Sequence, residues 1–222
     1  MTDDPLPDDA TLDEVRAALA PRLATHAGFD GWGEAAVSAA ADEVGVDRAV
    51  ARLAFPGGAV DLVDAWFDSL DRRVVAAFPA ERVEPMRVSG RIGAFIEHRL
   101  DLMAADREGL RRALGVLARP QNLRATARLG WRTADRLWRL AGDRATDWNH
   151  YSKRAILIGV YASTVAVFLD DDSEGQADTR AFLGRRLADV GRFEKAKAQL
   201  TGGERDRPSL TRFLGRLRYP AV

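Results

Sequence analysis

The sequence predicts an all-α protein. Apolar residues recur every three to four positions along most of the chain, which is the period of a helix with one buried face. No stretch shows the sustained alternation of apolar and polar residues that a half-buried strand requires. Glycine and proline punctuate the periodic segments. We expect about nine to ten helices, divided between an amino-terminal helix-turn-helix-like module and a larger carboxy-terminal helical domain.

The first helix has a clear start signal. It begins behind Thr11, where Glu14 completes a capping-box pattern, and Gly28 is expected to end it. Residues 1–10 precede it. They are rich in Asp and Pro and contain no apolar run, so we interpret them as a short disordered lead and not as a signal or transit peptide.

Two short helices joined by a glycine turn should follow. The first spans 34–44, and the second begins behind Asp47, whose side chain can cap it. Phe55-Pro56-Gly57-Gly58 ends this region. Residues 11–58 are therefore predicted to form the helix-turn-helix-like module.

The remaining helices are longer and belong to the second domain, residues 59–200. They are expected at 59–78, 85–103, 107–117, 122–141, 148–169 and 177–200. Ala155 to Leu169 is uncharged but shorter than the roughly 20 residues needed to cross a bilayer, so we interpret it as a buried core helix. A polar linker, 201–208, leads to a last segment, 209–222.

Composition excludes several classes of site. The 33 basic residues balance the 33 acidic ones, which leaves no net charge to attract nucleic acid or an acidic surface. Without cysteine there is no disulfide or thiolate metal site. The three histidines are scattered, and Glu97 and His98 are adjacent, so they point to different helix faces and predict no di-iron site.

Catalytic motifs are also missing from the sequence. There is no nucleophile elbow, phosphate-binding glycine loop or dinucleotide fingerprint. The acidic run 170–174 lacks the spacing of a calcium loop, and we interpret it as a solvated turn. We therefore expect no catalytic residues, no metal and no cofactor.

The charge pattern argues against DNA binding. The expected recognition helix offers only Arg48 and Arg52, whereas most affinity for DNA comes from neutralising phosphates. The next helix carries four aspartates at helical spacing, an acidic stripe that would repel a phosphate backbone. The stripe consists of Asp61, Asp64, Asp68 and Asp71.

Aromatic residues are concentrated in two consecutive helices of the second domain. Such residues suit an elongated apolar ligand, although aromatic stripes more often fill a core. Both readings remain open for each residue. The residues are Trp131, Trp138, Trp148, Tyr151, Tyr161 and Phe168.

The last segment has the pattern of a basic amphipathic helix. Its apolar residues are spaced i, i+3, i+4, i+7 and its arginines fall on the other faces, which suits a helix lying in a membrane interface. Docking on the protein or on a second copy is the alternative. The predicted membrane-binding residues are Leu210, Arg212, Phe213, Leu214, Arg216 and Leu217.

Several motifs of the second domain resemble the Coq-nine family of ubiquinone-biosynthesis accessory proteins. They are Trp131-Arg132-Thr133-Ala134-Asp135, Ala141-Gly142-Asp143, Thr146-Asp147-Trp148-Asn149, Tyr151-Ser152-Lys153-Arg154-Ala155, Val160-Tyr161-Ala162-Ser163-Thr164, Asp171-Asp172-Ser173 and Arg192-Phe193-Glu194-Lys195. The resemblance runs from about Phe55 to Lys197. It implies a fold like that of TetR-type regulators, which residues 45–56 also resemble.

The resemblance further implies an isoprenoid or quinone lipid as ligand and a separate demethoxyubiquinone hydroxylase as partner. The expected lipid-binding residues are Trp131, Leu137, Trp138, Tyr161, Thr164 and Phe168. The implied hydroxylase surface comprises Leu137, Trp138, Asp147, His150 and Tyr151. His150 departs from the family, which more usually has a bulky aromatic there. Asp147 could also serve as a helix cap.

Together these features predict a non-enzymatic accessory protein that presents a demethoxyubiquinone-type lipid to its partner at a membrane surface. We expect a homodimer in the bacterial cytoplasm, peripheral on the inner membrane, that does not bind DNA. The alternative is a ligand-responsive TetR-type transcription regulator with the same fold.

Overall fold

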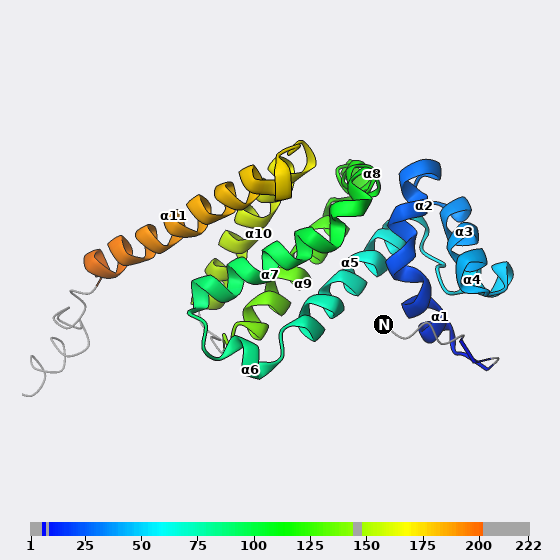
Figure 1. The fold of residues 1–222 in the computed structure, drawn as a ribbon, viewed down its shortest axis with the longest axis horizontal. Coiled ribbons are helices and arrows are strands. Elements are labelled where there is room, and N and C mark those ends of the chain that lie inside the picture. The colour runs from blue at the N-terminus through cyan, green and yellow to red at the C-terminus, as the bar shows by residue number, and fades with distance from the viewer. Residues whose placement is uncertain (1–5, 8, 144–147, 202–222) are drawn as a thin grey trace, which may run out of the picture.

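The computed structural model describes residues 6–7, 9–143 and 148–201, and among these every regular element is a helix. The predicted all-α class is therefore confirmed for the described chain. Four short helices, α1–α4, pack together at one end of the molecule (Figure 1). The longer helices α5 and α7–α11 form the rest, and the far end of α11 extends away from the body (Figure 1).

The amino-terminal helices begin where their capping residues predicted. The Thr11 side chain and Glu14 form the complete capping box of α1 (Leu12–Leu19). The chain then does not continue as one helix to Gly28. Pro21 lies in a 3₁₀ turn, Ala20–Arg22, because proline has no backbone N–H for an α-helix interior, and α2 runs on over Leu23–Asp30.

The helix-turn-helix geometry is present. Helix α3 (Glu34–Val44) ends at Gly45, whose φ of +79° is in the left-handed region that glycine tolerates best. Asp47 then caps α4 (Arg48–Leu53) by accepting hydrogen bonds from the backbone N–H groups of Ala49 and Val50, at 2.8 and 3.1 Å. The expected capping role of Asp47 is confirmed.

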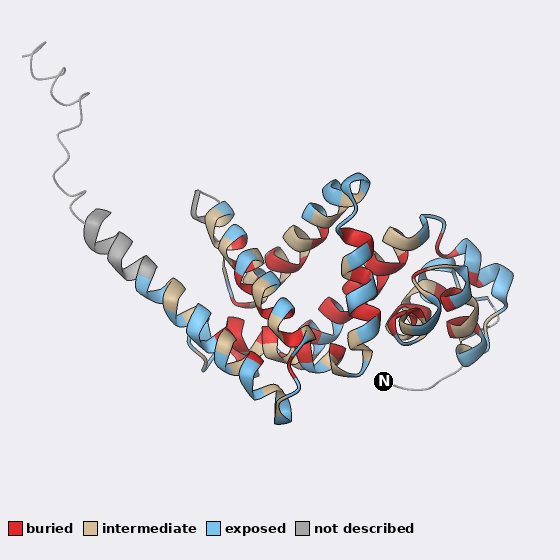
Figure 2. Cartoon of the chain, turned by 90° about the horizontal axis from the view of Figure 1, so that it is seen from above, coloured by how far each residue is buried: buried red, intermediate tan, exposed pale blue. Residues whose placement is uncertain are grey.

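Helix α5 (Gly58–Ala77) links the module to the larger domain, as Figure 1 shows. After it come a short helix, α6 (Ala80–Val83), and α7 (Val88–Met103), where a single helix from residue 85 was expected. Helices α8 (Arg107–Leu117) and α9 (Leu123–Leu140) follow. Helix α10 (Trp148–Leu169) leads to α11 (Ala177–Thr201). Buried residues lie on the sides of the central helices that face one another (Figure 2).

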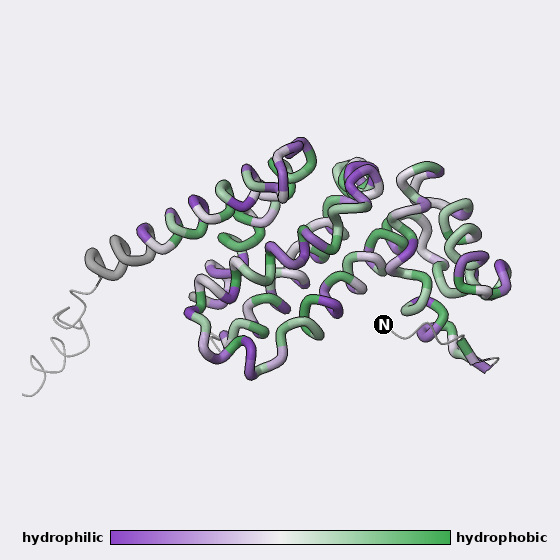
Figure 3. Tube along the Cα trace, in the orientation of Figure 1, coloured by the Kyte–Doolittle hydropathy of each residue, from purple (hydrophilic) through white to green (hydrophobic). Residues whose placement is uncertain are grey.

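Helix α10 is less buried than expected. Its segment His150–Leu169 is long and apolar enough to cross a membrane by length and composition, and 33% of the best window is buried. The hydropathy of α10 is visible in Figure 3. The core helix of a soluble protein also passes this test of length and composition, but such a helix is mostly buried. The interpretation of 155–169 as a buried core helix holds only in part, because small residues such as Ala155, Ala162 and Ala166 lie exposed along one side.

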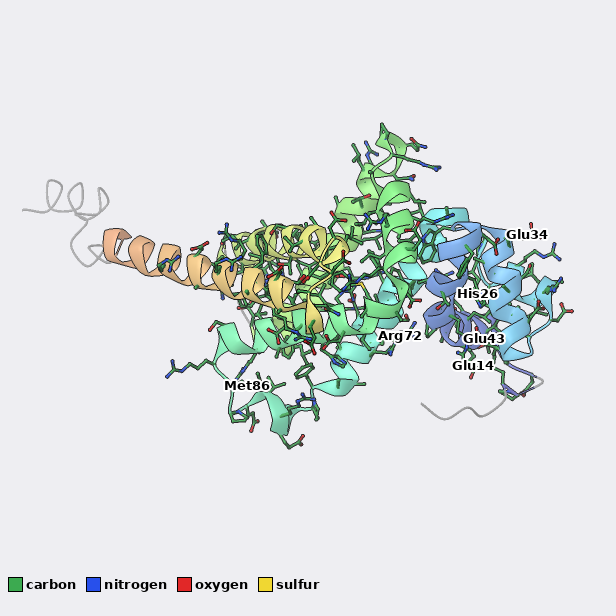
Figure 4. All side chains as sticks on the ribbon, turned by 45° about the horizontal axis from the view of Figure 1, so that its top comes forward. Glu14, His26, Glu34, Glu43, Arg72 and Met86 are labelled. Carbon is green, nitrogen blue, oxygen red and sulfur yellow. The ribbon has the colours of Figure 1, made fainter. Side chains whose placement is uncertain are left out.

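The acidic stripe of α5 is not a free surface, which corrects the sequence interpretation. Each aspartate is paired with an arginine from another helix that packs against α5. The pairs are Asp61 with Arg16, Asp64 with Arg132, Asp68 with Arg136 and Asp71 with Arg99. Arg72, labelled in Figure 4, adds a second cation 2.7 Å from Asp68. The stripe therefore joins α5 to α1, α7 and α9.

The acidic turn 170–174 is exposed at Asp170, Asp172 and Glu174, as expected, but not at Asp171. Asp171 is 5% exposed and accepts hydrogen bonds from the backbone N–H groups of Ser173 (2.9 Å) and Thr179 (2.8 Å), and from both hydroxyls. The Ser173 and Thr179 hydrogen bonds hold the pKa of Asp171 well below its usual range. Asp171 thus anchors the start of α11.

A candidate lipid cavity between α8, α9 and α10

An apolar cavity of about 270 Å³ lies between α8, α9 and α10, with Phe67 of α5 contributing to its wall. The wall is mostly apolar. Its side chains are Phe67, Leu110, Leu114, Leu117, Thr126, Leu129, Gly130, Thr133, Ala134, Leu137, Leu157, Ile158, Tyr161, Ala162, Val165, Ala166 and Leu169. Such a space favours an apolar ligand over a polar one.

Helical spacing explains why these residues share one wall. On α8 the lining leucines are 110, 114 and 117, which is one face of a helix. On α10 Leu157, Tyr161 and Val165 follow at intervals of four. Helix α9 presents its apolar side inward, while its arginines lie on the other sides, where Arg132 and Arg136 pair with aspartates of α5. The cavity forms where these three apolar faces do not fill the space between them.

One side of the cavity has a polar network behind it. The Tyr161 hydroxyl accepts a hydrogen bond from Arg99 Nε at 2.8 Å. Arg99 is fully buried and pairs with buried Asp71, and the Thr133 hydroxyl donates to Asp71 Oδ2 at 3.2 Å. Burial opposes the charge of Arg99, but Asp71 and Tyr161 outweigh it, so the pKa of Arg99 is raised. Thr133 and Tyr161 therefore connect the wall to a buried ion pair.

A second apolar cavity, of about 190 Å³, adjoins the first. It lies between α7, α10 and α11, with Trp138 of α9 on its wall. Leu157 lines both cavities. The second cavity is lined by Val88, Ser89, Ile92, Trp138, Lys153, Ile156, Leu157, Val160, Leu187, Val190 and Gly191.

The structure distributes the predicted lipid-binding residues over several environments. Leu137 and Tyr161 line the first cavity, and Trp138 lines the second. Thr164 and Phe168 are fully buried and belong to neither wall; the Thr164 hydroxyl donates to the Val160 carbonyl at 2.7 Å. Direct lipid contact by these residues stays a prediction.

Trp131, the sixth predicted lipid-binding residue, belongs to an aromatic cluster with two predicted partner-binding residues. Its ring centroid lies 5.8 Å from that of Tyr151 and 6.2 Å from that of His150. His150 and Tyr151 meet edge to face, with centroids 5.2 Å apart. Tyr151 is 56% exposed, which is high for so large a side chain. We call Trp131, His150 and Tyr151 the aromatic cluster.

The other predicted partner-binding residues lie differently. Leu137 is buried against the first cavity. Trp138 is half-buried and its indole N–H donates to the Lys153 carbonyl at 3.0 Å. Asp147 lies outside the described residues, so neither its capping role nor its partner contact is tested. The terminal segment 209–222 and its predicted membrane-binding residues also lie outside them.

Two motif residues whose role was not foreseen hold α9 and α10 together. Arg154 is 1% exposed and its guanidinium donates to Asp135 at 2.7 Å and to Asp143 at 3.1 Å. Lys153 Nζ donates to the other oxygen of Asp143 at 2.7 Å. The sequence signal that could have indicated this role was the two consecutive basic residues near the start of an otherwise apolar helix. These contacts fix the helix ends beside the aromatic cluster.

Other wall and network residues were also missed. Phe67, the three α8 leucines, Arg99 and Asp71 come from helices far from α9 and α10 in sequence, and only packing brings them together. Among the described residues, no group of three or more His, Cys, Asp or Glu side chains could hold a metal ion.

Comparison with known families identifies the motif-bearing helices. The sequence model of the COQ9 (Coq-nine) family matches residues 123–194, which span α9, α10 and most of α11. Over these helices the chain is therefore similar to the COQ9 family. The matched range includes all of the α9 and α10 residues that line the first cavity, and all of the aromatic cluster.

Curated proteins of the same name are also similar to this chain. The mitochondrial ubiquinone biosynthesis protein COQ9 of Rattus norvegicus is 29% identical over 167 residues, covering 72% of this chain and 53% of the relative. The Homo sapiens protein of the same name is 28% identical, with 72% and 52% covered. The Xenopus tropicalis protein is 36% identical over 95 residues, 43% of this chain and 30% of the relative. The chain thus spans about half the length of the rat and human relatives.

The fold is similar to that of a solved structure whose name is not that of a ubiquinone biosynthesis protein. A TetR transcriptional regulator from Nitrosomonas europaea superposes with a TM-score of 0.62 and 25% identity, covering 78% of this chain and 95% of that structure. The expected TetR-like fold of this chain is therefore confirmed.

Proposed function

We propose that this chain is a non-catalytic accessory protein of ubiquinone biosynthesis that binds an isoprenoid or quinone lipid and presents it to a demethoxyubiquinone hydroxylase. The observation that carries the proposal is the apolar cavity built from helices α9 and α10, where the chain is similar to the COQ9 family. Relatives named as ubiquinone biosynthesis proteins share this part of the chain.

The size of the cavity agrees with partial enclosure of a lipid. Small-molecule pockets usually measure about 300–1,000 Å³. At about 270 Å³ the first cavity accommodates a ring or a few isoprene units and not a whole polyprenyl chain. The adjoining cavity of about 190 Å³ offers more apolar wall beyond Leu157. A long lipid would therefore extend out of the protein, which suits transfer to a partner.

The aromatic cluster is the proposed docking surface for the hydroxylase. Trp131 follows Gly130, which lines the cavity, so the cluster lies next to the ligand wall. Exposed aromatic side chains are enriched among residues that dominate protein interfaces. Peripheral attachment to the bacterial inner membrane through residues 209–222, and homodimerisation, are further parts of the proposal that rest on the sequence pattern and the family resemblance.

A TetR-type transcription regulator is the alternative because of the solved neighbour. The charges of the helix-turn-helix favour it less. Both arginines of α4 are already paired with carboxylates of α3: Arg48 with Asp42 at 2.5 Å and Arg52 with Glu34 at 2.9 Å. Glu34 lies at the edge of the module, as Figure 4 shows. Elsewhere in the module, the His26 ring nitrogen lies 3.0 Å from a carboxylate oxygen of Glu43. The carboxylates beside both α4 arginines reduce the positive charge that this helix offers to phosphates.

Filling the cavity should abolish lipid binding without unfolding the protein. A Cβ at Gly130 would meet Ile158 at 3.8 Å, an ordinary contact, so Gly130→Leu places its larger side chain in cavity space. We expect at least a tenfold loss of affinity for a short-chain ubiquinone. Stability should hold or rise, because glycine is about 0.8–1 kcal/mol less favourable than alanine in a helix. Quinone-dependent melting shifts measure both quantities.

The matched control is Gly159→Leu. Gly159 is an exposed glycine of α10 where an added Cβ would meet open space, and it lines neither cavity. It should bind quinone as the unchanged protein does. Equal binding by both variants would remove the cavity from the proposal.

Truncating the exposed tyrosine should weaken the partner complex more than the fold. Interface hot spots cost about 2 kcal/mol or more when truncated, so Tyr151→Ala should lower affinity for the hydroxylase about thirtyfold. The free energy of unfolding should fall by about 1.5 kcal/mol or less, which is the upper value of an aromatic pair. Calorimetric titration with purified hydroxylase and chemical denaturation measure the two effects.

Leu123→Ala provides the comparison for this test. Leu123 is 57% exposed, nearly the same as Tyr151, and begins α9 outside the aromatic cluster. It should leave hydroxylase affinity unchanged. If Tyr151→Ala binds as tightly as Leu123→Ala, the cluster is not the docking surface.

A further inference from the structure

The first cavity has three hydroxyl groups on its wall. They differ in whether the hydroxyl already donates a hydrogen bond to an acceptor within the protein. The Thr126 hydroxyl donates to the carbonyls of Leu117 and Asn122, at 2.7 and 3.0 Å. The Thr133 hydroxyl donates to Asp71 at 3.2 Å. The Tyr161 oxygen accepts from Arg99 at 2.8 Å, and its own O–H has no acceptor among the described residues. Tyr161 is therefore the wall hydroxyl with a proton to donate.

Arg99 makes that hydroxyl a strong donor. Donation from a cation into the phenol oxygen polarises the O–H bond, as happens along chains of hydrogen bonds in low-dielectric surroundings. The Arg99 guanidinium also lies 5.6 Å from the Tyr161 ring centroid and 5.3 Å from that of Phe67. Its Nη2 has no hydrogen-bond partner among the described residues. Burial raises the pKa of Tyr161, so the phenol keeps its proton at neutral pH.

Each buried charge behind the wall already has a partner. Asp71 contacts Arg99, and Arg136 lies 3.3 Å from Asp71 and 2.5 Å from Asp68. Asp68 has a further partner in Arg72, whose side chain is 55% exposed. A lipid carboxylate would add an uncompensated negative charge beside buried Asp71, which is costly in an apolar site. A neutral acceptor oxygen of the lipid would add no charge beside Asp71.

We propose that Tyr161 donates a hydrogen bond to a neutral acceptor oxygen of the bound lipid, such as a ring carbonyl, and that the site thereby selects oxygenated rings over hydrocarbons and lipid carboxylates. This inference rests on the proposed lipid binding and adds the polar chemistry by which the cavity distinguishes its ligands. Tyr161 is a binding and specificity residue, since its hydroxyl would touch the ligand.

Three probes with the same alkyl chain and a six-membered ring test the selection: decylbenzoquinone, decylbenzene and ionised 4-decylbenzoate. The unchanged protein should bind the quinone about five- to tenfold more tightly than decylbenzene, the effect of one net hydrogen bond. Tyr161→Phe should remove that preference and leave decylbenzene affinity unchanged. Ser163→Ala, which removes a hydroxyl of α10 that lies in neither cavity wall, should keep the preference.

A second measurement does not depend on any variant. With a ¹³C-labelled quinone bound to the unchanged protein, isotope-edited infrared spectra should show one carbonyl band moved to lower frequency. This keeps the test decisive if Tyr161→Phe does not fold after Arg99 loses its acceptor.

The outcomes separate this inference from the proposed function. If all three probes bind alike and no carbonyl band moves, the hydrogen bond is absent although the cavity binds lipids. Tightest binding by 4-decylbenzoate would also overturn it, because the site would then select an anion. If no probe binds the unchanged protein, the proposed lipid binding itself is wrong.

Discussion

Replacing Asp71 by alanine is expected to lower the free energy of unfolding by about 3–5 kcal/mol, because removing one partner of a buried ion pair leaves the other uncompensated. Asp71 is 1% exposed and contacts Arg99, Thr133 and Arg136. Arg99 would remain fully buried without its carboxylate. Chemical denaturation followed by circular dichroism measures the loss.

Two further variants show whether the charge is the cause. Asp68→Ala removes a neighbouring carboxylate of α5 whose arginine partners, Arg72 and Arg136, are 55% and 36% exposed. It should cost about 1 kcal/mol or less, as more exposed pairs do. The double variant Asp71→Leu with Arg99→Met removes both charges and should recover most of the loss. If Asp71→Ala costs no more than Asp68→Ala, the buried pair does not hold these helices together.

Replacing Gly109 by alanine should destabilise the protein by about 1–3 kcal/mol, the usual cost of overpacking. A Cβ on Gly109, in α8, would lie 2.2 Å from the backbone oxygen of Ala24 in α2, so the two helices would have to separate. The Trp32 indole N–H also donates to the Gly109 carbonyl at 3.0 Å. The change therefore strains the contact between the amino-terminal module and the larger domain. Thermal unfolding measures it.

Gly115→Ala, in the same helix, should change stability in the opposite direction to Gly109→Ala. No atom lies within 4 Å of a Cβ placed there. Alanine should raise stability by up to about 1 kcal/mol, because glycine costs helix propensity. If Gly109→Ala and Gly115→Ala shift the melting temperature in the same direction, the close approach of α2 and α8 does not require glycine at 109.

The local signals in the sequence predicted much of the fold. The capping box at Thr11 and the cap at Asp47 depend on residues within three positions, so they could be identified without tertiary information. The same holds for α8 and α10, whose bounds match their apolar periodicity. The continuous helix expected up to Gly28 was wrong, because a proline at 21 outweighed the period.

The candidate site was predicted only in part. Tyr161 and Leu137 were expected at a ligand and line the cavity, since they share the apolar faces of neighbouring helices. Phe67 and the α8 leucines were not foreseen, because they reach the same wall from more distant segments. The family motif drew attention to Lys153-Arg154, yet their pairing with Asp143 depends on how the end of α9 meets α10.

The sequence by itself determined the helical class, the capping residues and the helices that carry the family motifs, because these depend on short-range spacing and residue type. Tertiary structure decided what the charges do. The aspartates of α5 form an acidic stripe by spacing alone, but arginines from α1, α7 and α9 convert them into ion pairs. Whether a charge faces water or a partner depends on contacts between residues far apart in the chain, and periodicity carries no information about those contacts.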